Sequence, residues 1–515
     1  MTSFQTVTVA ARACAVAVIG IEGHLTEAQA TIANGPPGLR ITGLPDSTVR
    51  EARDRVYAAV VNSGQAWPGR TVTVTLLPAS LPRHGSGFDL AIAIATLTAA
   101  GAVPGGVPEN CVFYSALGLD GRLRPVRGVV PALLAAGRAG CTRAVVAPEN
   151  APEAVMVPGL AVVPCHSLRA VLAWLRGEPF PRQPDLPVPS TAAPAVACPP
   201  AISLATLAVP SHVRQALEAS AAGGHHLCLA GPRGSRVPAL ATGLAALLPA
   251  LGPGEVTEVT SIHSAAGLLA SGRALVTRPP LRAPHHTITP GAMAGGGTGM
   301  TRPGEAALAH RGVLFLDQAP EFARGVLRIL RQPLEHGEVT VSRSARTVRF
   351  PAKFTLAAGM SPCPCGGWPG CACSPVRARR YRARLTGELG SYLAIWLNAA
   401  CPEPSAAASR HPGENPDAMS AERVAAARDR ARHRLKRTPW EINADVPGAE
   451  LRRSYQPLPE ASAPISRAVD LGEISARAAY QVVRVAWTLA DLAGNARPGA
   501  EECGQALAFQ LGTAR

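Results

Sequence analysis

The sequence Gly312-Val313-Leu314-Phe315-Leu316-Asp317 is an uninterrupted apolar run that ends on a carboxylate. Such a run is typical of a central strand in a parallel sheet, because helices cover both faces of that sheet and the strand needs no polar side. Around it, from residue 206 to about residue 400, strand, loop and helix patterns alternate. The sequence therefore predicts an α/β module with a parallel sheet at its centre.

The segment Ala230-Gly231-Pro232-Arg233-Gly234-Ser235-Arg236-Val237-Pro238 begins like a phosphate-binding loop and departs from that motif at its end. In the consensus GxxxxGK(S/T), glycines let backbone N–H groups curl around phosphates, the Lys neutralises them and the hydroxyl holds magnesium. Arg236, Val237 and Pro238 occupy the last three positions here, although a guanidinium can still pair with an oxyanion. The candidate nucleotide-binding residues, without the usual geometry, are Gly231, Gly234, Ser235, Arg236, Val237 and Pro238.

The chain is long and strongly basic, with 515 residues, a formal net charge of +15 and a pI near 9.8. This length is enough for about two to four domains with full cores. The charge fits an anionic partner such as nucleic acid. However, enrichment in Ala, Arg, Gly and Pro with only two lysines, Lys353 and Lys436, is equally what a GC-rich genome produces.

The sequence predicts neither secretion nor a membrane span. The apolar run at residues 10–19 lacks a basic leader and a convincing cleavage site. No run reaches the roughly 18 to 20 apolar residues that a membrane span needs. The twelve cysteines are scattered apart from one cluster, unlike those of a secreted disulfide scaffold. We therefore expect a cytoplasmic protein.

The residue patterns divide the chain into three folded parts and two linkers. Strand-like residues 72–77 and the helical pattern of 89–100 predict an N-terminal α/β or α+β domain, and the Pro-rich residues 177–202 predict a linker. A basic helix at 421–437 and helical apolar spacing at 474–492 predict a small all-helical domain. The expected boundaries are 1–176, 177–205, 206–400, 401–420 (a flexible linker) and 421–515.

Several unusual strings occur in one order along the chain. They are GLPDSTVREARDRVYAAVVNSG (residues 43–64), LRAPHHT (281–287), GVLFLDQAPEF (312–322), LRQPLEHGEVTVSR (330–343), SPCPCG (361–366) and SARAAYQVVRVAWTLADLAG (475–494). Together they resemble the YifB/ComM family of magnesium-chelatase-like AAA+ ATPases over nearly the whole chain. The resemblance implies a Lon-protease-like N-terminal α+β domain, a central AAA+ parallel-sheet module and a C-terminal helical lid domain.

The resemblance also implies what the protein does. Family members of the ComM type are hexameric motors that drive DNA branch migration during natural transformation, and they are not thought to insert magnesium into porphyrin. The likeness to Lon does not extend to proteolysis, because Lon-type cleavage needs a Ser activated by a Lys and residues 1–176 contain no Lys.

The Walker B strand of an AAA+ motor ends on a metal-binding Asp followed by a Glu that activates the attacking water. The resemblance places Asp317 at the Asp position and Gln318 at the Glu position. A neutral amide can orient water but cannot accept its proton as a carboxylate does. Gln318 therefore predicts slow hydrolysis.

Other positions that handle the γ-phosphate are substituted as well. The family string AAMNPCPCG reads AAGMSPCPCG here, so Ser361 stands where an Asn is expected. The string SGPLLDRID becomes TGELGSYLA, which places Tyr392 at the Arg that acts on a neighbouring subunit. Near the second sensor, Arg477 and Arg484 keep the basic pattern, whereas Trp487 replaces another Arg.

These losses share one task, and together they predict an ATPase-impaired protein that keeps the fold. We expect a DNA-associated or ring-modulating paralogue, in a homo- or hetero-hexameric ring with an intact relative. Three alternatives stay open: binding of ATP and Mg²⁺ without turnover, a gene product with no retained role, and an active ATP-dependent branch-migration motor.

A cysteine cluster follows the sensor position. Its spacing is CxCx5CxC, and four thiolates so close in sequence can hold a structural zinc ion in a tetrahedron, although CxC is tighter than the usual CxxC. Four reduced thiols in a loop are the alternative. The candidate zinc ligands are Cys363, Cys365, Cys371 and Cys373.

Two runs of basic residues can each meet DNA phosphates. For the second run, a solvated helix face is the alternative. The first run consists of Arg377, Arg379, Arg380, Arg382 and Arg384, with Tyr381 among them. The second consists of Arg423, Arg428, Arg430, Arg432, Arg434, Lys436 and Arg437.

Overall fold

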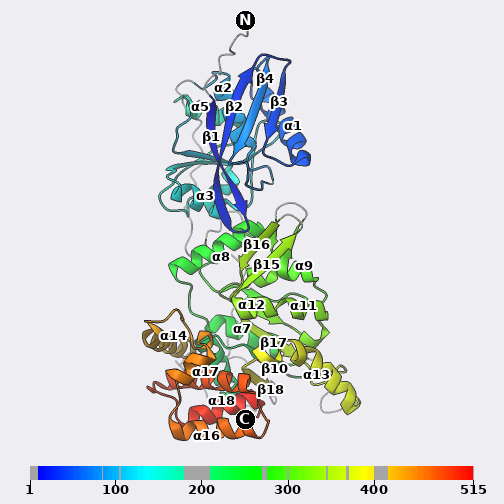
Figure 1. Cartoon of the computed structure of the whole chain (residues 1–515), viewed down its shortest axis with the longest axis vertical. Helices are drawn as coiled ribbons and strands as arrows, with labels where there is room; N and C mark the ends of the chain where they lie inside the picture. Colours follow the sequence, from blue (N-terminus) through cyan, green and yellow to red (C-terminus); the bar gives the residue numbers. More distant parts are fainter. Residues whose placement is uncertain are drawn as a thin grey trace.

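The computed structural model arranges three folded parts in chain order along the molecule, with the N-terminal domain at one end and a helical domain at the other (Figure 1). Arg233 and most of the two expected linkers lie outside the described residues. The described residues are 10–83, 85–103, 106–178, 209–232, 234–269, 275–297, 301–343, 346–366, 371–398 and 416–513.

The N-terminal domain is built on a mixed seven-stranded sheet. Its strands are β1 (Ala11–Ile19), β2 (Glu22–Ala33), β3 (Gly38–Thr42), β4 (Thr71–Leu77), β5 (Cys111–Tyr114), β8 (Arg143–Val146) and β9 (Ala161–Pro164). The strand order is β3-β4-β2-β1-β5-β8-β9. β2 pairs antiparallel with β1 and β4, and the other neighbours are parallel.

Helices cover both faces of this sheet. They are α1 (Asp46–Asn62), α2 (Asp89–Ala99), α3 (Val129–Arg138), the short α4 (Ala151–Ala154) and α5 (Leu168–Leu175). Successive side chains of a strand point to opposite faces. Accordingly, Ala15 and Ala17 of β1 pack in a core with α1, α2 and α5, whereas Val16 packs in a second core with α3.

The central module contains the five-stranded sheet that the sequence predicts. Its strands are β10 (Leu227–Ala230), β11 (Leu281–Arg282), β14 (Val313–Leu316), β17 (Thr355–Met360) and β18 (Ile395–Asn398). Their order is β11-β14-β17-β10-β18, and every neighbouring pair is parallel. All four residues of β14 are buried, which confirms the interpretation of the apolar run as a central strand.

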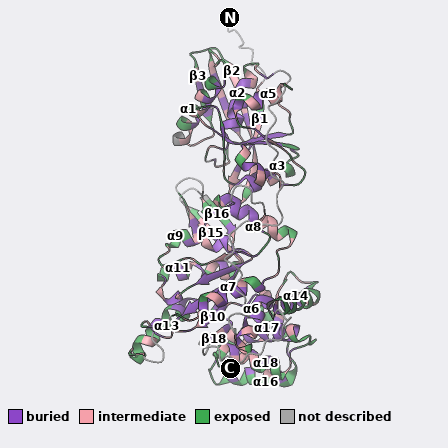
Figure 2. Ribbon diagram, turned by 180° about the vertical axis from the view of Figure 1, so that it is seen from behind, coloured by how far each residue is buried: buried purple, intermediate pink, exposed green. Residues whose placement is uncertain are grey.

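Helices and two hairpins surround the central sheet. The helices are α6 (Ser211–Gly223), α7 (Val237–Leu247), α8 (Pro253–Ala266), α9 (Pro290–Ala294), α10 (Glu305–Leu308), α11 (Arg324–Ile329), α12 (Arg331–His336) and α13 (Pro375–Leu389). The hairpins are β12 (Gly295–Gly296) with β13 (Arg302–Pro303), and β15 (Glu338–Arg343) with β16 (Arg346–Pro351). Figure 2 shows α13 projecting from the module with exposed residues along it.

The C-terminal domain is helical, as expected. Its helices are α14 (Pro416–Leu435), α15 (Gly448–Arg453), α16 (Pro459–Asp470), α17 (Ala476–Ala493) and α18 (Ala500–Leu511). Ser475 caps α17 by accepting from the N–H of Ala478, and Gly494 ends that helix in the left-handed region with φ 81°. α14 begins at Pro416, inside the interval expected to be a flexible linker, because a proline is well suited to a first helical turn.

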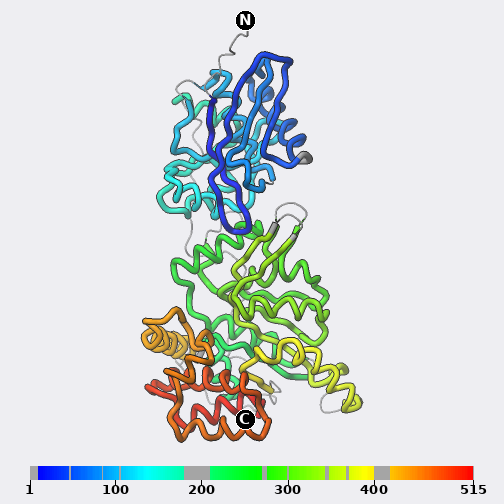
Figure 3. Tube along the Cα trace, viewed as in Figure 1, coloured from blue at the N-terminus to red at the C-terminus, as the bar shows by residue number. Residues whose placement is uncertain are grey.

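The N-terminal domain meets the central module at two places. Ile19 and Ile21, at the β1–β2 turn, pack with Val348 and Phe350 of β16, and this turn reaches the module in Figure 3. In addition, Ser264 of α8 caps α3, because its carbonyl accepts from Gly128 N at 3.0 Å and its Oγ accepts from Val130 N at 3.3 Å.

No helix in the described ranges is both long enough and apolar enough to cross a membrane.

Candidate functional site

The candidate residues gather at one edge of the central sheet. β10, β14 and β17 run parallel, so Ala230, Leu316 and Met360 end on the same side. The backbone N–H of Gly231 donates to the carbonyl of Met360 at 2.9 Å. The loop after β10, the Asp317–Gln318 pair after β14 and Ser361 after β17 therefore lie next to one another.

The loop after β10 turns its polar groups on itself. A Cβ added at Gly231 would come within 2.6 Å of Ser235 Oγ, so this hydroxyl lies over the Gly231 backbone. The N–H of Ser235 donates to the carbonyl of Pro232 at 3.0 Å. Gly234, at φ 80°, makes the turn in a left-handed conformation that glycine adopts without strain. The N–H of Ser235 is thus used inside the loop and not offered to a phosphate.

Val237, at the Lys position of the consensus, points into the core. It is buried with Phe315, and a Cβ added at Gly359 would come within 2.9 Å of Val237 Cγ1. Arg236 is the N-cap residue of α7, and Pro238 lies in its first turn, where the missing N–H costs no helical bond. These side chains do not fit the usual arrangement for a triphosphate with magnesium, since no ammonium and no hydroxyl stands at the start of the helix.

Gln318 and Ser361 are in direct contact. The Oγ of Ser361 donates to Oε1 of Gln318 at 2.9 Å, and the hydroxyl of Tyr381 in α13 donates to the same oxygen at 3.4 Å. Gln318 is also one of two described non-glycine residues with positive φ, at 52°. Its amide oxygen is therefore engaged by the chain itself, while the preceding Asp317 is exposed.

Tyr392 is turned inward. Only 5 % of its surface is exposed, and its hydroxyl donates to Glu335 of α12 in the same chain. The guanidinium of Arg477 lies 4.8 Å from the centre of the Tyr392 ring, which is cation–π geometry. Tyr392, which the sequence resemblance places at the position of a trans-acting arginine, therefore makes an internal contact between the central module and the helical domain.

The two arginines of the second-sensor pattern have separate environments. Arg477 is exposed at the start of α17 and contacts Tyr392 as described. Arg484 donates from Nε to the carbonyl of Val446 at 2.8 Å, and burial, followed by the nearby charge of Arg477, lowers the pKa of Arg484. The structure thus places Arg484 within the helical domain.

The four cysteines of the cluster come together before α13. The Sγ of Cys363 lies 3.1 Å from the sulfurs of both Cys365 and Cys371, and all four Sγ atoms, with that of Cys373, lie within 4.8 Å of one another. Zn–S bonds of about 2.3 Å place the sulfurs of a tetrahedron roughly 3.8 Å apart. The four thiols therefore suit a zinc ion by their chemistry, and their sulfur–sulfur separations, from 3.1 Å to at most 4.8 Å, span this distance.

The two basic runs differ in what they contact. All five arginines of α13 are exposed, and in the part of the chain that the structure describes only Arg384 has a carboxylate within reach, Glu321 at 4.0 Å. In α14, Arg428 donates from Nε and Nη2 to the carbonyl of Ala221, and Arg434 pairs with Asp491. Arg423 pairs with Glu218. The first run is a free cationic face, and much of the second run holds the helical domain in place.

Sequence reasoning missed the inward face of α13. Tyr381, Leu385 and Glu388 are buried at spacings of four and three residues, which is the helical period. Tyr381 touches Gln318, and Glu388 receives Arg324 at 2.5 Å. The spacing of these residues in the sequence is the signal of a buried helix face, although arginines stand between them.

The central module has a parallel sheet with a phosphate-loop position after its first strand, an Asp after β14 and a polar residue after β17. A helical domain follows it. This combination defines an AAA+ P-loop-type protein. Family models agree over most of the chain. "Magnesium chelatase, subunit ChlI" matches residues 203–405, "Subunit ChlI of Mg-chelatase" matches 28–150, and "Magnesium chelatase, subunit ChlI C-terminal" matches 414–510.

Relatives narrow the class to one family. An uncharacterised protein of Mycobacterium tuberculosis is 42% identical over 506 residues, which cover 98% of this chain and 99% of that protein. The competence protein ComM of Haemophilus influenzae is 34% identical over 498 residues, 96% of each chain. The uncharacterised protein YifB of Escherichia coli is 34% identical over 479 residues, 92% of each chain. The chain belongs to the YifB/ComM family of magnesium-chelatase-like AAA+ proteins.

Proposed function

We propose that this chain is a cytoplasmic, DNA-associated member of the family that does not turn over ATP at an ordinary rate. The observation that carries the proposal is the group of internal contacts at the carboxyl edge of the sheet. Val237 is buried where a Lys would meet phosphate, Gln318 is engaged by Ser361, and Tyr392 faces Glu335 of its own chain. Each of these side chains makes an internal contact at a position that a motor would use for phosphoryl transfer.

A role inside a ring follows from the same proposal. A subunit that keeps the module and the helical domain but lacks hydrolysis can occupy a place in a homo- or hetero-hexamer and modulate an intact relative. Support comes from the shared core, because α6, α7, the central sheet and the C-terminal helices pack in one hydrophobic cluster. The alternative is an active branch-migration motor, which the exposed Asp317 at the end of β14 favours.

DNA contact is assigned in this proposal to the exposed face of α13. Its arginines carry no strong internal partner, and the helix begins directly after the cysteine cluster. Arg379 and Arg382 also line a cavity of about 580 Å³ beside Pro232 and Met360. Guanidinium groups on a projecting helix pair readily with backbone phosphates, which gives affinity without sequence preference.

Neutralising this face should weaken DNA binding. We expect the triple variant Arg379→Gln, Arg380→Gln and Arg382→Gln to bind branched or duplex DNA at least about tenfold more weakly near 0.1 M salt, because three phosphate contacts are lost. The slope of log K against log salt should fall by roughly 0.9 per contact. Fluorescence anisotropy over a salt series measures both quantities.

A control with the same charge change lies on α14. Arg432→Gln, Lys436→Gln and Arg437→Gln also removes three exposed positive charges. If this control loses as much affinity and salt slope as the α13 variant, the assignment to α13 is wrong and net charge alone governs binding.

We further propose that the cysteine cluster binds zinc. Cys363, Cys365, Cys371 and Cys373 would hold the ion, which would tie residues 363–365 to 371–373 and fix the start of α13. Zinc in such a closed thiolate site supplies folding energy and no chemistry.

Removing one ligand should release the metal. The purified chain should contain about one zinc per chain by elemental analysis, and Cys363→Ser should lose most of it, because three thiolates hold zinc far more weakly than four. Cys14→Ser, on β1 and far from the cluster in sequence, is the matched control and should keep its zinc. A wild-type chain without zinc after metal-replete expression would refute this site.

A further inference from the structure

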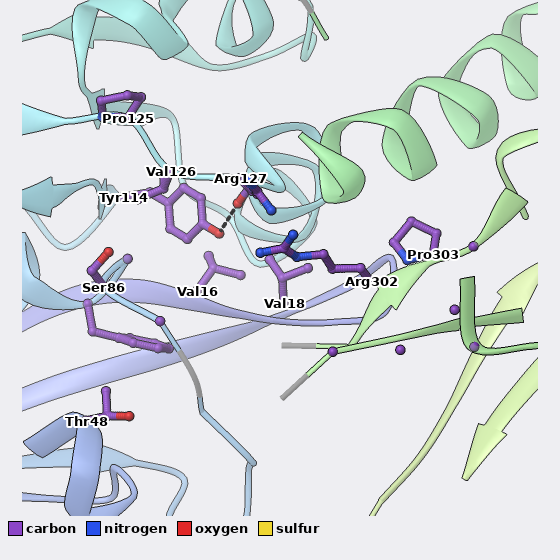
Figure 4. Close-up of a pocket in the computed structure, with 18 of the residues that line it drawn as sticks. Val16, Val18, Thr48, Ser86, Tyr114, Pro125, Val126, Arg127, Arg302 and Pro303 are labelled. Carbon is purple, nitrogen blue, oxygen red and sulfur yellow. Dashed lines mark hydrogen bonds between the residues drawn. The ribbon is translucent and has the colours of Figure 1, made fainter. Parts of the chain in front are cut away.

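A cavity of about 1040 Å³ lies between the N-terminal domain and the central module (Figure 4). From the N-terminal side it is lined by Val16 and Val18 of β1, the turn at residues 85–88 and the segment 125–127. From the central module it is lined by residues of α9 and β12, most of them glycines, and by residues 302–304. This volume is at the upper end of small-ligand sites, so the cavity has room for more than an inorganic ion.

Two arginines face this cavity, one from each side. Arg127 belongs to the N-terminal domain and Arg302 to β13, and Figure 4 shows the guanidinium of Arg302 directed toward Arg127 and the ring of Tyr114. None of the described residues that line the cavity is an Asp or a Glu. Within the described ranges neither guanidinium forms an ion pair with a carboxylate, although Arg127 also packs on Gly267 at the end of α8. Two like charges brought together in this way are stabilised by an anion between them.

The backbone that carries each arginine is held firmly. The hydroxyl of Tyr114, itself 5 % exposed, donates to the carbonyl of Arg127 at 2.9 Å. On the other side, Gly295 has φ 114°, and a Cβ added there would come within 2.5 Å of the carbonyl oxygen of Arg302. Only a glycine permits this close approach of β12 to β13. The two cations therefore sit on preformed walls.

We propose that this cavity binds a small phosphate-bearing anion, with Arg127 and Arg302 as its cationic ligands from two domains. A guanidinium pairs with phosphate oxygens through two parallel N–H bonds, and two of them match a ligand with two phosphates. The hydroxyls of Thr48 and Ser86 also line the cavity and offer further hydrogen bonds, and Val16 and Val18 provide an apolar floor for the remainder of the ligand. The bound anion joins the N-terminal domain to the central module.

This site does not use the residues at the carboxyl edge of the central sheet, so it can be tested separately from the proposed function. Pyrophosphate is the probe, measured by isothermal titration calorimetry on the full chain at low salt. We expect saturable binding, with Arg302→Gln and Arg127→Gln each weakening it by about tenfold or more, since a charge-assisted pair is lost. Arg138→Gln, an exposed arginine of α3 that does not line the cavity, should bind like the wild type.

Two further measurements show which class of ligand supplies the phosphates and whether the loop after β10 binds them instead. ADP that binds more tightly than pyrophosphate, with the same dependence on Arg302, assigns the ligand to nucleotides; equal affinities assign it to the phosphates alone. Arg236→Gln, in the loop after β10, reports on phosphate binding at that loop and so distinguishes it from binding in this cavity. Absence of saturable binding, equal losses in Arg138→Gln, or a loss in Arg236→Gln but not in Arg302→Gln would each overturn the proposal. Circular dichroism confirms that the variants are folded.

Discussion

ATP hydrolysis by the purified chain should stay at the background of the assay, with or without branched DNA. Phosphoryl transfer depends on positioned charges, and a trans-acting arginine alone is worth roughly 10³- to 10⁵-fold in rate. The family resemblance places Tyr392, which is bound to Glu335 of its own chain, at that position and Gln318 at the water-activating position. We therefore expect turnover at least about a thousandfold slower than that of a relative with an intact GxxxxGK(S/T) loop.

The sharpest control is the one acidic residue that survives. Asp317→Ala should leave the measured rate unchanged, because no magnesium-dependent turnover remains for it to support. A coupled-enzyme or phosphate-release assay, with the intact relative run in parallel, is sensitive enough. DNA-stimulated turnover that disappears in Asp317→Ala would show that the chain is an active motor, and the alternative function would then hold. ATP or ADP binding without turnover, lost in Arg236→Gln, would place a residual nucleotide site at the loop.

The fold could be predicted from the sequence because its signals are local. The run that became β14 is buried at all four positions, and the pattern at residues 474–492 became α17, which begins two residues later and ends one residue later. The strand-like residues 72–77 became part of β4, in which buried and half-buried residues alternate. Such patterns record which face of an element is buried, and burial is what the fold preserves.

The arrangement of the site could be predicted only in part. The resemblance assigned Gln318 and Ser361 to one γ-phosphate site, but their mutual hydrogen bond depends on side-chain rotamers that no motif encodes. The inward turn of Tyr392 depends on Glu335, which is 57 residues away in the chain. The roles of the arginines in α14 were also hidden, because their partners Glu218 and Asp491 come from α6 and α17. Charge along one helix does not reveal which charges are neutralised in the fold.

Removal of the carboxylate that pairs with Arg434 should lower the stability of the protein more than any other change proposed here. Asp491 is 1 % exposed and accepts from Arg434 Nη2 at 2.7 Å and from Asn443 Nδ2 at 2.9 Å, while the Arg434 guanidinium lies 4.3 Å from the centre of the Trp487 ring. Asp491→Ala leaves the largely buried guanidinium of Arg434 without its carboxylate, and breaking a fully buried pair typically costs about 3–5 kcal/mol, which is the upper bound here. We expect the helical domain to unfold at a clearly lower urea concentration, followed through the fluorescence of Trp487 and its neighbours.

Asp429→Ala separates this loss from the removal of any acidic residue near α14. Asp429 pairs with Arg432 at 2.7 Å, but its side chain is 72 % exposed, so the pair is screened by solvent and its loss should cost at most about 0.5 kcal/mol. Because the chain has several domains, the comparison rests on the first unfolding transition and not on one global free energy. If both variants shift that transition equally, the Arg434–Asp491 pair does not hold the helical domain. A large shift confined to Asp491→Ala would mean that Arg434 is kept for the fold, so that this part of the basic run of α14 is not free to meet DNA.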